Sequence, residues 1–391
     1  MKYALNICVM ASIGLVSVST ANEFTMFTDA EVSGQLRTAA VTQNNSTDTF
    51  TYASAVGAQL KYELAEYYGF NAGFGFITSQ DIGLLTGDKD TGKQNDELSS
   101  SAGKHTELNE AYVNYNYGGL NFRSGKQVLD TPLADSDDIR MILNTFDAHT
   151  LTYEISSTTL MLGNLNKWQG FDAGLGDGWV KTGEDGTWFG GITYSGVVDF
   201  NIWYYNVTQA LSAIYADFSA GYDINDDMSV NIAVQYLDES EIDNSGTAAS
   251  IYGTSVELSA YGVGLGVAYN ISNKIADKTS FSGFGGGTLF TNMDTMIIDE
   301  ITLDRTATAL VAALNYEIEN FNIFYAYGDF IGEKDGAGET AHILEQNIGV
   351  EYAVGEELAM SVLYVIESDE NSAAKTENDW SRFQGTISYN F

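Results

Sequence analysis

The last ten residues, Arg382-Phe-Gln-Gly-Thr-Ile-Ser-Tyr-Asn-Phe391, decide how the rest of the chain is interpreted. Reading back from Phe391, aromatic, aliphatic or glycine residues occupy every second position, and polar residues lie between them. This period of two predicts a β-strand with one face in an apolar environment and the other in water. A strand of a soluble sandwich can alternate in the same way. It rarely places an aromatic residue at the carboxyl terminus, where fraying is expected.

This ending resembles the terminal-strand signal that outer-membrane β-barrels present to their assembly machinery. The residues that would form the signal are Phe383, Ile387, Tyr389 and Phe391. The resemblance implies that the barrel assembly machinery is a partner. It also implies that the protein lies in the outer membrane of a Gram-negative bacterium, in contact with outer-membrane lipid and lipopolysaccharide.

The amino terminus has the features of a secretory signal. Lys2 precedes a mostly apolar stretch over residues 4–18, and residues 19–21 are small, as expected before a signal-peptidase site. The stretch is too short for a membrane-spanning helix. We therefore expect residues 1–21 to be a removed signal peptide and residues 22–391 to form a single barrel domain. Cys8, the only cysteine, would leave with the signal, so the mature chain would have no disulfide.

Composition narrows the class of protein further. The chain has 40 Gly, 24 Tyr and 20 Phe but a single Pro, which suits strands and turns better than helices. The formal net charge is −36, and it becomes −37 when the signal leaves, because Lys2 is the only charged residue of that segment. So negative a chain excludes nucleic acid as a probable partner and favours cations.

Alternating segments recur along the whole chain. We count about eighteen of them, each near the length that a tilted strand needs to cross a bilayer. Examples are 50–64, 68–76, 111–117, 198–204, 228–236, 261–269, 308–316, 321–327 and 358–366. The pattern predicts an all-β protein, a transmembrane antiparallel β-barrel of about 18 strands.

The links between segments alternate in length, which favours a barrel with short turns on one rim and long loops on the other. The predicted short turns are 65–67, 118–119, 156–157, 195–196, 223–227, 271–273, 317–320 and 354–357. The predicted loops are 42–49, 79–106, 127–148, 169–186, 238–249, 285–304, 331–341 and 368–378, together with one brief link near Val207 and Thr208. This order predicts an even number of strands with both termini in the periplasm.

The loop with the only proline carries a second resemblance. Its region resembles the third loop of the OprD-type porins and of the Campylobacter-type major outer membrane porins. The pattern runs from Gly-x-Gln through Thr-Pro to Asp-x-Arg and a Phe, and the matching residues are Gly125, Gln127, Thr131, Pro132, Asp138, Arg140 and Phe146. The likeness covers about sixty residues. The chain departs from it at Ile142-Leu143, where the family often has a proline.

The resemblance implies an eighteen-stranded porin, trimeric in the Campylobacter-type branch, whose third extracellular loop folds inward and narrows the lumen. The residues of the loop agree with an inward path. Leu133, Ile139, Met141, Ile142 and Leu143 are more aliphatic residues than an exposed loop would use, and they could pack against the barrel wall.

Charged residues of this loop and of the wall are the candidate pore constriction. The loop residues are Asp130, Asp135, Asp137, Asp138 and Arg140, and the wall residues, on the polar face of their strands, are Arg37, Arg123, Arg305 and Glu110. Opposed acids and bases would set up a transverse field, and the excess of carboxylates would make cations the preferred ions. The alternative is that these residues only solvate the inner wall and pair with one another.

Metal binding and catalysis leave weaker signals. Asp135 and Asp138 could hold calcium through oxygen ligands, as the Campylobacter-type porins suggest, and no other cofactor is expected. The histidines are His105, His149 and His342, and no nucleophile motif lies beside any of them, so we expect no enzyme activity.

The function favoured by the sequence is a water-filled, cation-preferring diffusion channel for ions and small hydrophilic solutes. A substrate-preferring channel for amino acids, peptides or carboxylates is the alternative within transport. A surface adhesin or structural barrel that only displays its loops is the alternative from another class.

Overall fold

The computed structural model describes residues 25–46, 49–99, 103–137, 140–175, 178–371, 376 and 378–391. The predicted signal peptide and Cys8 lie outside the described residues. Among the residues described, no helix is long and apolar enough to cross a membrane.

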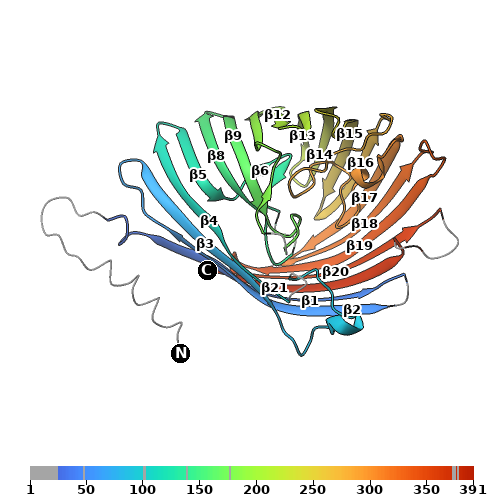
Figure 1. Cartoon of the computed structure of the whole chain (residues 1–391), viewed down its shortest axis with the longest axis horizontal. Helices are drawn as coiled ribbons and strands as arrows, with labels where there is room; N and C mark the ends of the chain where they lie inside the picture. Colours follow the sequence, from blue (N-terminus) through green and yellow to red (C-terminus); the bar gives the residue numbers. More distant parts are fainter. Residues whose placement is uncertain are drawn as a thin grey trace, which may run out of the picture.

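Eighteen strands form the wall of a closed barrel, as predicted from the alternation (Figure 1). They are β1 (Glu31–Asn44), β2 (Phe50–Glu63), β3 (Phe70–Asp81), β4 (Lys104–Tyr117), β5 (Leu120–Gln127), β8 (Thr145–Ile155), β9 (Thr158–Gln169), β11 (Thr187–Tyr194), β12 (Asp199–Val207), β13 (Leu211–Asn225), β14 (Met228–Glu241), β15 (Ala249–Ala260), β16 (Val263–Ser272), β17 (Ala307–Ile318), β18 (Phe321–Gly332), β19 (Ala341–Val354), β20 (Leu358–Asp369) and β21 (Trp380–Asn390). The short elements of the links are β6 (Asp130–Thr131), β7 (Ala134–Asp135), β10 (Val180–Lys181), η1 (Lys89–Thr91) and η2 (Ile298–Ile301).

Each wall strand pairs antiparallel with the next one, and β21 pairs with β1 to close the barrel. The last residue takes part in this closure. The Phe391 N–H donates to the Gly34 carbonyl at 3.0 Å, and the Gly34 N–H donates to the Phe391 carbonyl at 2.9 Å. The four residues of the predicted assembly signal are exposed on the outer face of β21 and at its end. Their role in assembly stays a prediction.

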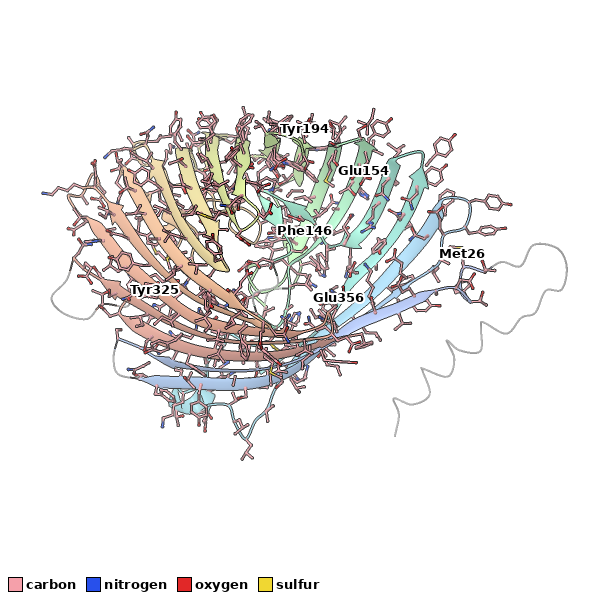
Figure 2. All side chains as sticks on the ribbon, turned by 180° about the vertical axis from the view of Figure 1, so that it is seen from behind. Met26, Phe146, Glu154, Tyr194, Tyr325 and Glu356 are labelled. Atoms are coloured by element: carbon pink, nitrogen blue, oxygen red, sulfur yellow. The ribbon has the colours of Figure 1, made fainter. Side chains whose placement is uncertain are left out.

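The two faces of the wall differ as the period of two predicts. Large apolar side chains are exposed along the outer face, as Leu314, Ile323 and Tyr325 illustrate on β17 and β18. Side chains project from both faces in Figure 2, where Phe146 lies on the inner side of the curved sheet. A closed sheet has no unpaired strand edge, and its apolar outer face suits the hydrocarbon of a membrane.

One predicted turn is wrong. Residues 271–273 do not form a short turn; β16 runs through 271–272, and residue 273 begins a long loop, 273–306. The short turn lies at Tyr261-Gly262, where φ is 52° and 80°. Two successive positive φ angles are the geometry of a tight hairpin turn that matches the twist of the strands. Tyr261 aligns with the apolar face of the segment that follows, and this hid the turn in the sequence.

Three long loops enter the barrel, and the sequence predicted only one of them. We number the long loops in chain order, so that the second is 82–103, the third is 128–144 and the seventh is 273–306. Figure 1 shows the third loop, with β6, descending inside the curved wall. The aliphatic side chains of Leu133, Met141, Ile142 and Leu143 are buried, which confirms the predicted packing, while Ile139 lies outside the described residues.

Two apolar clusters hold these loops in place. In the larger one, Leu133 of the third loop and Phe284 of the seventh pack with Tyr205 of the wall. In the smaller one, Leu98 of the second loop and Met141 of the third pack against wall residues such as Ala55. Each fully buried Leu or Met contributes about 1.5–3 kcal/mol by removal from water. The apolar core of this barrel therefore lies inside its lumen, between loops and wall.

Candidate pore constriction

The third and seventh loops are joined to each other by backbone hydrogen bonds. β6 and β7 form a two-stranded hairpin with Pro132 at its turn. Next to it, the Phe284 N–H donates to the Leu133 carbonyl at 2.9 Å, and the Asp135 N–H donates to the Phe284 carbonyl at 3.2 Å. The Leu133 N–H donates to the Tyr205 hydroxyl of the wall at 3.3 Å. The two loops therefore form one insert fixed to the wall.

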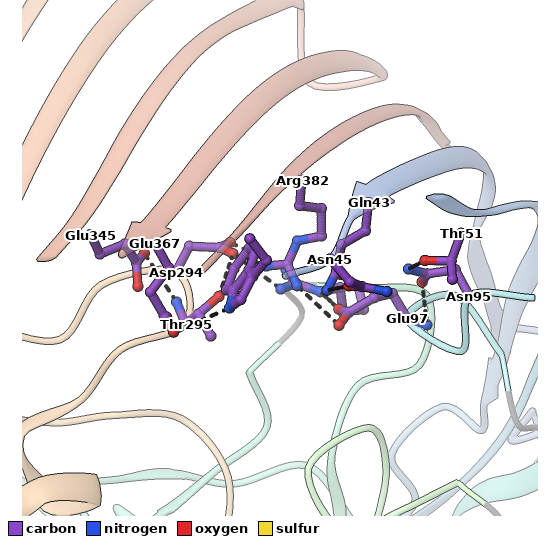
Figure 3. Close-up of polar contacts among 12 residues, drawn as sticks. Gln43, Asn45, Thr51, Asn95, Glu97, Asp294, Thr295, Glu345, Glu367 and Arg382 are labelled. Atoms are coloured by element: carbon purple, nitrogen blue, oxygen red, sulfur yellow. Dashed lines mark hydrogen bonds and ion pairs between the residues drawn. The ribbon is translucent and has the colours of Figure 1, made fainter. Parts of the chain in front are cut away.

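Four charged side chains meet where the second, third and seventh loops approach β21. We call Glu97, Arg140, Asp294 and Arg382 the central ion cluster. Arg140 lies 2.8 Å from a Glu97 oxygen and 3.2 Å from an Asp294 oxygen. Arg382 lies 2.9 Å from the other Glu97 oxygen and also pairs with Asp294. Figure 3 shows Arg382 reaching towards both carboxylates.

The central ion cluster is deeply buried and balanced in charge. The side chains of both arginines are 4% exposed, and that of Asp294 is 13% exposed. Burial alone would raise the pKa of Asp294, but the positive charges of Arg140 and Arg382 hold it below its usual value. Burial alone would lower the pKa of Arg140, but Asp294 and Glu97 raise it. The cluster pairs two arginines with two carboxylates, so its formal charges sum to zero.

Cavities lie on both sides of this cluster. A cavity of about 410 Å³, near the rim with the short turns, is lined by residues that include Arg37, Arg140 and Asp294. A cavity of about 430 Å³, among the long loops, is lined by residues that include Asp137, Asp294 and Glu300. Asp294 lines both cavities. The central ion cluster therefore lies between two solvent spaces inside the barrel.

The acidic residues of the third loop face the solvent spaces. Asp130 and Asp135 line a cavity of about 520 Å³, bounded on its other side by wall residues of β11 and β12. The pKa of Asp135 is raised to about 6 by burial and then by the neighbouring charges of Asp130, Asp137 and Asp172. The third loop therefore concentrates negative charge in the lumen. Asp138 lies outside the described residues.

The structure brings some predicted wall residues to the loop. The Nε of Arg37 donates to the Ser388 hydroxyl at 3.0 Å, and the same guanidinium donates to the Arg140 carbonyl. Arg123 lines a cavity of about 600 Å³ together with Asp130. Arg37 thus bonds to the third loop from the wall, while Arg123 only shares a cavity with it.

Two other predicted wall residues pair elsewhere. Glu110 is buried on β4 and lies 3.3 Å from Lys61 of β2. Arg305 lies 2.8 Å from Asp335, in the link between β18 and β19. Neither bonds to the third loop in the part of the chain that the structure describes. The contact of Glu110 matches the alternative reading, pairing along the inner wall, whereas the predicted wall position of Arg305 is wrong, because Arg305 lies at the end of the seventh loop, before β17 begins.

The sequence analysis missed Glu97, Asp294 and Arg382, which complete the central ion cluster. Glu97 and Asp294 belong to long acidic loops in which no pattern distinguishes one carboxylate from another. Arg382 left a readable signal, because it lies on the polar face of the terminal strand in a chain with 17 basic and 53 acidic residues. A base on that face would be expected to bind a carboxylate, but not one from a loop nearly ninety residues away.

The wall also binds the backbone of the seventh loop, which the sequence did not indicate. The carboxylate of Glu345 accepts from the N–H groups of Thr295 at 3.3 Å and Met296 at 2.5 Å. The Gln235 side chain donates to the Thr288 carbonyl at 2.7 Å and accepts from the Phe290 N–H at 3.1 Å. Backbone amides buried against a wall need such partners, and these side chains supply them.

Neither a metal centre nor a catalytic group emerges from the described residues. No group of three or more His, Cys, Asp or Glu that could hold a metal is found within them. Calcium at Asp135 and Asp138 stays a prediction. His149 lies 2.8 Å from the Ser124 hydroxyl across the outer face of β5 and β8, a contact the sequence did not predict. No carboxylate bonds to His149 within the described ranges.

No family model and no curated protein sequence matches the chain, but many solved structures share its architecture. Pseudomonas aeruginosa OpdK, solved with vanillate, has a TM-score of 0.79 at 12% identity, over 94% of this chain and 99% of that one. The chain has the fold of the OprD-type porins. Acinetobacter baumannii OccAB4 has a TM-score of 0.77 at 14% identity, over 94% of this chain and 100% of that one. For A. baumannii OccAB3 the TM-score is 0.79 at 12% identity, over 93% and 100%. The OprD-type fold expected from the third loop is thus confirmed.

Proposed function

We propose that the protein is a porin of the Gram-negative outer membrane, a water-filled channel that passes small solutes and prefers cations. The observation that carries the proposal is the pair of cavities on either side of Asp294, inside a closed barrel with an apolar outer face. A barrel that only displayed its surface loops would not need solvent spaces on both sides of an inward insert.

The distribution of charge supports a preference for cations. Asp130, Asp135 and Asp137 line the solvent spaces, while Arg140 and Arg382 are held in ion pairs within the cluster. An ion that passes through the lumen meets mostly carboxylates. These lower the electrostatic energy of a cation and raise that of an anion. A diffusion channel of this kind performs no chemistry, so the proposal includes no enzyme activity.

A substrate-preferring channel is the second candidate. One of the similar structures, OpdK, was solved with vanillate, which is a statement about that protein. In this chain the feature that favours selectivity is Arg37, which lines the cavity near the short turns and could meet an anionic group. Against an anionic substrate, the two buried arginines beyond it are already occupied by Glu97 and Asp294.

Several partners belong to this proposal rather than to the observations. They are a signal peptidase acting after residue 21, the barrel assembly machinery acting on the terminal strand, lipopolysaccharide around the rim and two further copies of the chain in a trimer. The apolar outer face is compatible with lipid and with a neighbouring barrel.

The test is the reversal potential of the refolded protein in a planar bilayer under a potassium chloride gradient. We expect discrete open steps and a reversal potential whose sign corresponds to a preference for cations. Replacing Asp135, Asp137 and Asp138 together by Asn should move the potential towards zero, while E184Q, a change at an exposed acid between β10 and β11, should leave it near the wild-type value. A folded barrel that leaves the membrane silent would overturn the channel.

A further inference from the structure

Glu239 is a buried carboxylate without a basic partner. It projects from β14 into the barrel and is 2% exposed. On the neighbouring strands the residues directly opposite it are Ala213 and Ala249, which offer neither charge nor hydrogen bond. One carboxylate oxygen accepts from the Phe281 N–H at 2.9 Å. The other, Oε1, is buried and has no hydrogen-bond partner.

A second buried carboxylate from the seventh loop lies beside it. Asp299, in η2, is 8% exposed and accepts a hydrogen bond from the Ser280 hydroxyl. Ser280 precedes Phe281, whose N–H binds Glu239, so consecutive residues of the loop tie the two acids together. Burial raises the pKa of Asp299 to about 6.

No base neutralises the two acids within the described part of the chain. Neither Glu239 nor Asp299 forms an ion pair there. Lys278, two residues before Ser280, is paired at 2.7 Å with Glu241. Ionised carboxylates are not buried without compensation, because the cost of desolvation is several kcal/mol for each ion. The orphaned Oε1 atom marks the place where the compensating charge is required.

We infer that a divalent cation with oxygen ligands binds between Glu239 and Asp299 and fastens the seventh loop to β14. Two carboxylates balance a charge of two, and the Ser280 hydroxyl supplies a further neutral oxygen. Hard oxygen donors of this kind suit calcium, which is abundant outside the cell. Glu239 lies near the end of β14 that faces the long loops, so the site is on the side from which calcium would arrive.

This site is separate from the calcium predicted at Asp135 and Asp138. It joins the wall to both arms of the seventh loop, at Ser280 and at Asp299, and the segment between them carries Asp294 of the central ion cluster. The cation would therefore act on the structure of the insert, and its presence does not depend on whether the barrel conducts.

The experiment uses the folded full-length protein in detergent, stripped with a chelator and then titrated with calcium. Isothermal titration should show a site that is lost in both E239Q and D299N and retained in E351Q and D135N. The midpoint of thermal unfolding should rise with calcium in the wild type and the two retained variants only. E351Q controls for loose binding to an acidic protein, and D135N for the other predicted site.

Three outcomes would overturn the inference. Equal calcium binding by wild type and E239Q would place the cation elsewhere, and loss of binding in D135N alone would place it at the third loop. A melting midpoint that ignores calcium but rises on acidification from pH 8 to 6, and does so less in E239Q, would show a shared proton in place of a cation. If E239Q does not fold, D299N decides, because Asn keeps the shape of the loop residue.

Discussion

Replacing Asp294 by Asn tests whether the central ion cluster holds the inward loops. The change keeps the shape of the side chain and removes one charge from a group that was neutral overall. Arg140 and Arg382 would then share the single carboxylate of Glu97, at 2.8 and 2.9 Å, and the cluster would carry a charge of +1. Both guanidinium groups would stay buried, since their side chains are only 4% exposed.

The expected size follows from that burial. Removing one partner of a buried ion pair costs about 3–5 kcal/mol, because the charge that remains is not solvated. The amide oxygen of Asn still accepts one hydrogen bond, so we expect a loss near 3 kcal/mol in the free energy of unfolding. The matched control is E184Q, whose carboxylate pairs with Lys181 on the surface at 3.8 Å, with both side chains at least 60% exposed. An exposed pair of this kind contributes about 0–1 kcal/mol.

Two assays measure the effect. Urea denaturation in detergent should move to lower urea for D294N and stay unchanged for E184Q. In a planar bilayer, D294N should show noisier open steps, because the seventh loop is less firmly held, and a weaker cation preference, because a positive charge is added between the two cavities. The reasoning is refuted if D294N unfolds at the same urea concentration as E184Q and the wild type, and conducts with the same noise and selectivity as they do.

Two further predictions concern the same insert, and a third concerns the terminal strand. L133A should lower the free energy of unfolding by about 2–5 kcal/mol, because Leu133 is 1% exposed in the cluster between the loops and the wall; urea denaturation measures it, and an unchanged midpoint would contradict the packing. Because the pKa of Asp135 is raised to about 6, its charge is lost as the pH falls through 6, so the cation preference should decline between pH 7 and 5; a wild-type profile identical to that of D135N would exclude this assignment. Deleting Phe391 should reduce the yield of folded barrel in cells, while the deleted protein still refolds in detergent; equal yields in cells would argue against the terminal signal.

The same shift of Asp135 sets the sign of a stability effect. A carboxyl group whose pKa is raised in the folded loop binds its proton more tightly there than in the unfolded chain. Its contribution to stability is therefore present in full below the ordinary pKa and is lost as the pH rises through about 6. Asp294 acts in the opposite direction, since its lowered pKa gives stability that is present at neutral pH and lost as the pH falls through that lowered value.

The wall of the barrel was predictable because its rule is local. A strand with lipid on one side and water on the other must alternate, so residues such as Phe383 and Ile387 reveal their face from the sequence alone. The turn at Tyr261-Gly262 escaped because its geometry depends on positive φ angles and not on hydrophobicity. The resemblance to the OprD-type porins predicted the inward path of the third loop. The aliphatic residues of that loop, such as Leu133, were an independent reason to expect it.

The insert was less predictable because its contacts are distant in sequence. Glu97, Arg140, Asp294 and Arg382 come from three loops and the last strand, and no short pattern marks an acid that will meet a base so far away. The seventh loop was expected to be a long extracellular link, and its inward path follows from wall groups such as Glu345 that bind its backbone. Such groups look the same in the sequence as any acid that faces water.

The proposed preference for cations would follow from how the fold uses its few bases. Arg140 and Arg382 form ion pairs within the central ion cluster. Arg305 is paired with Asp335, and Lys278 with Glu241. Each of these pairs ties a loop to the wall or to another loop, which a wide barrel needs to keep its insert in place. The acids that remain over the cavities then outnumber the bases. In the proposed channel, selectivity is therefore a consequence of stability, and adding a base to the wall should weaken the cation preference without loosening the loops.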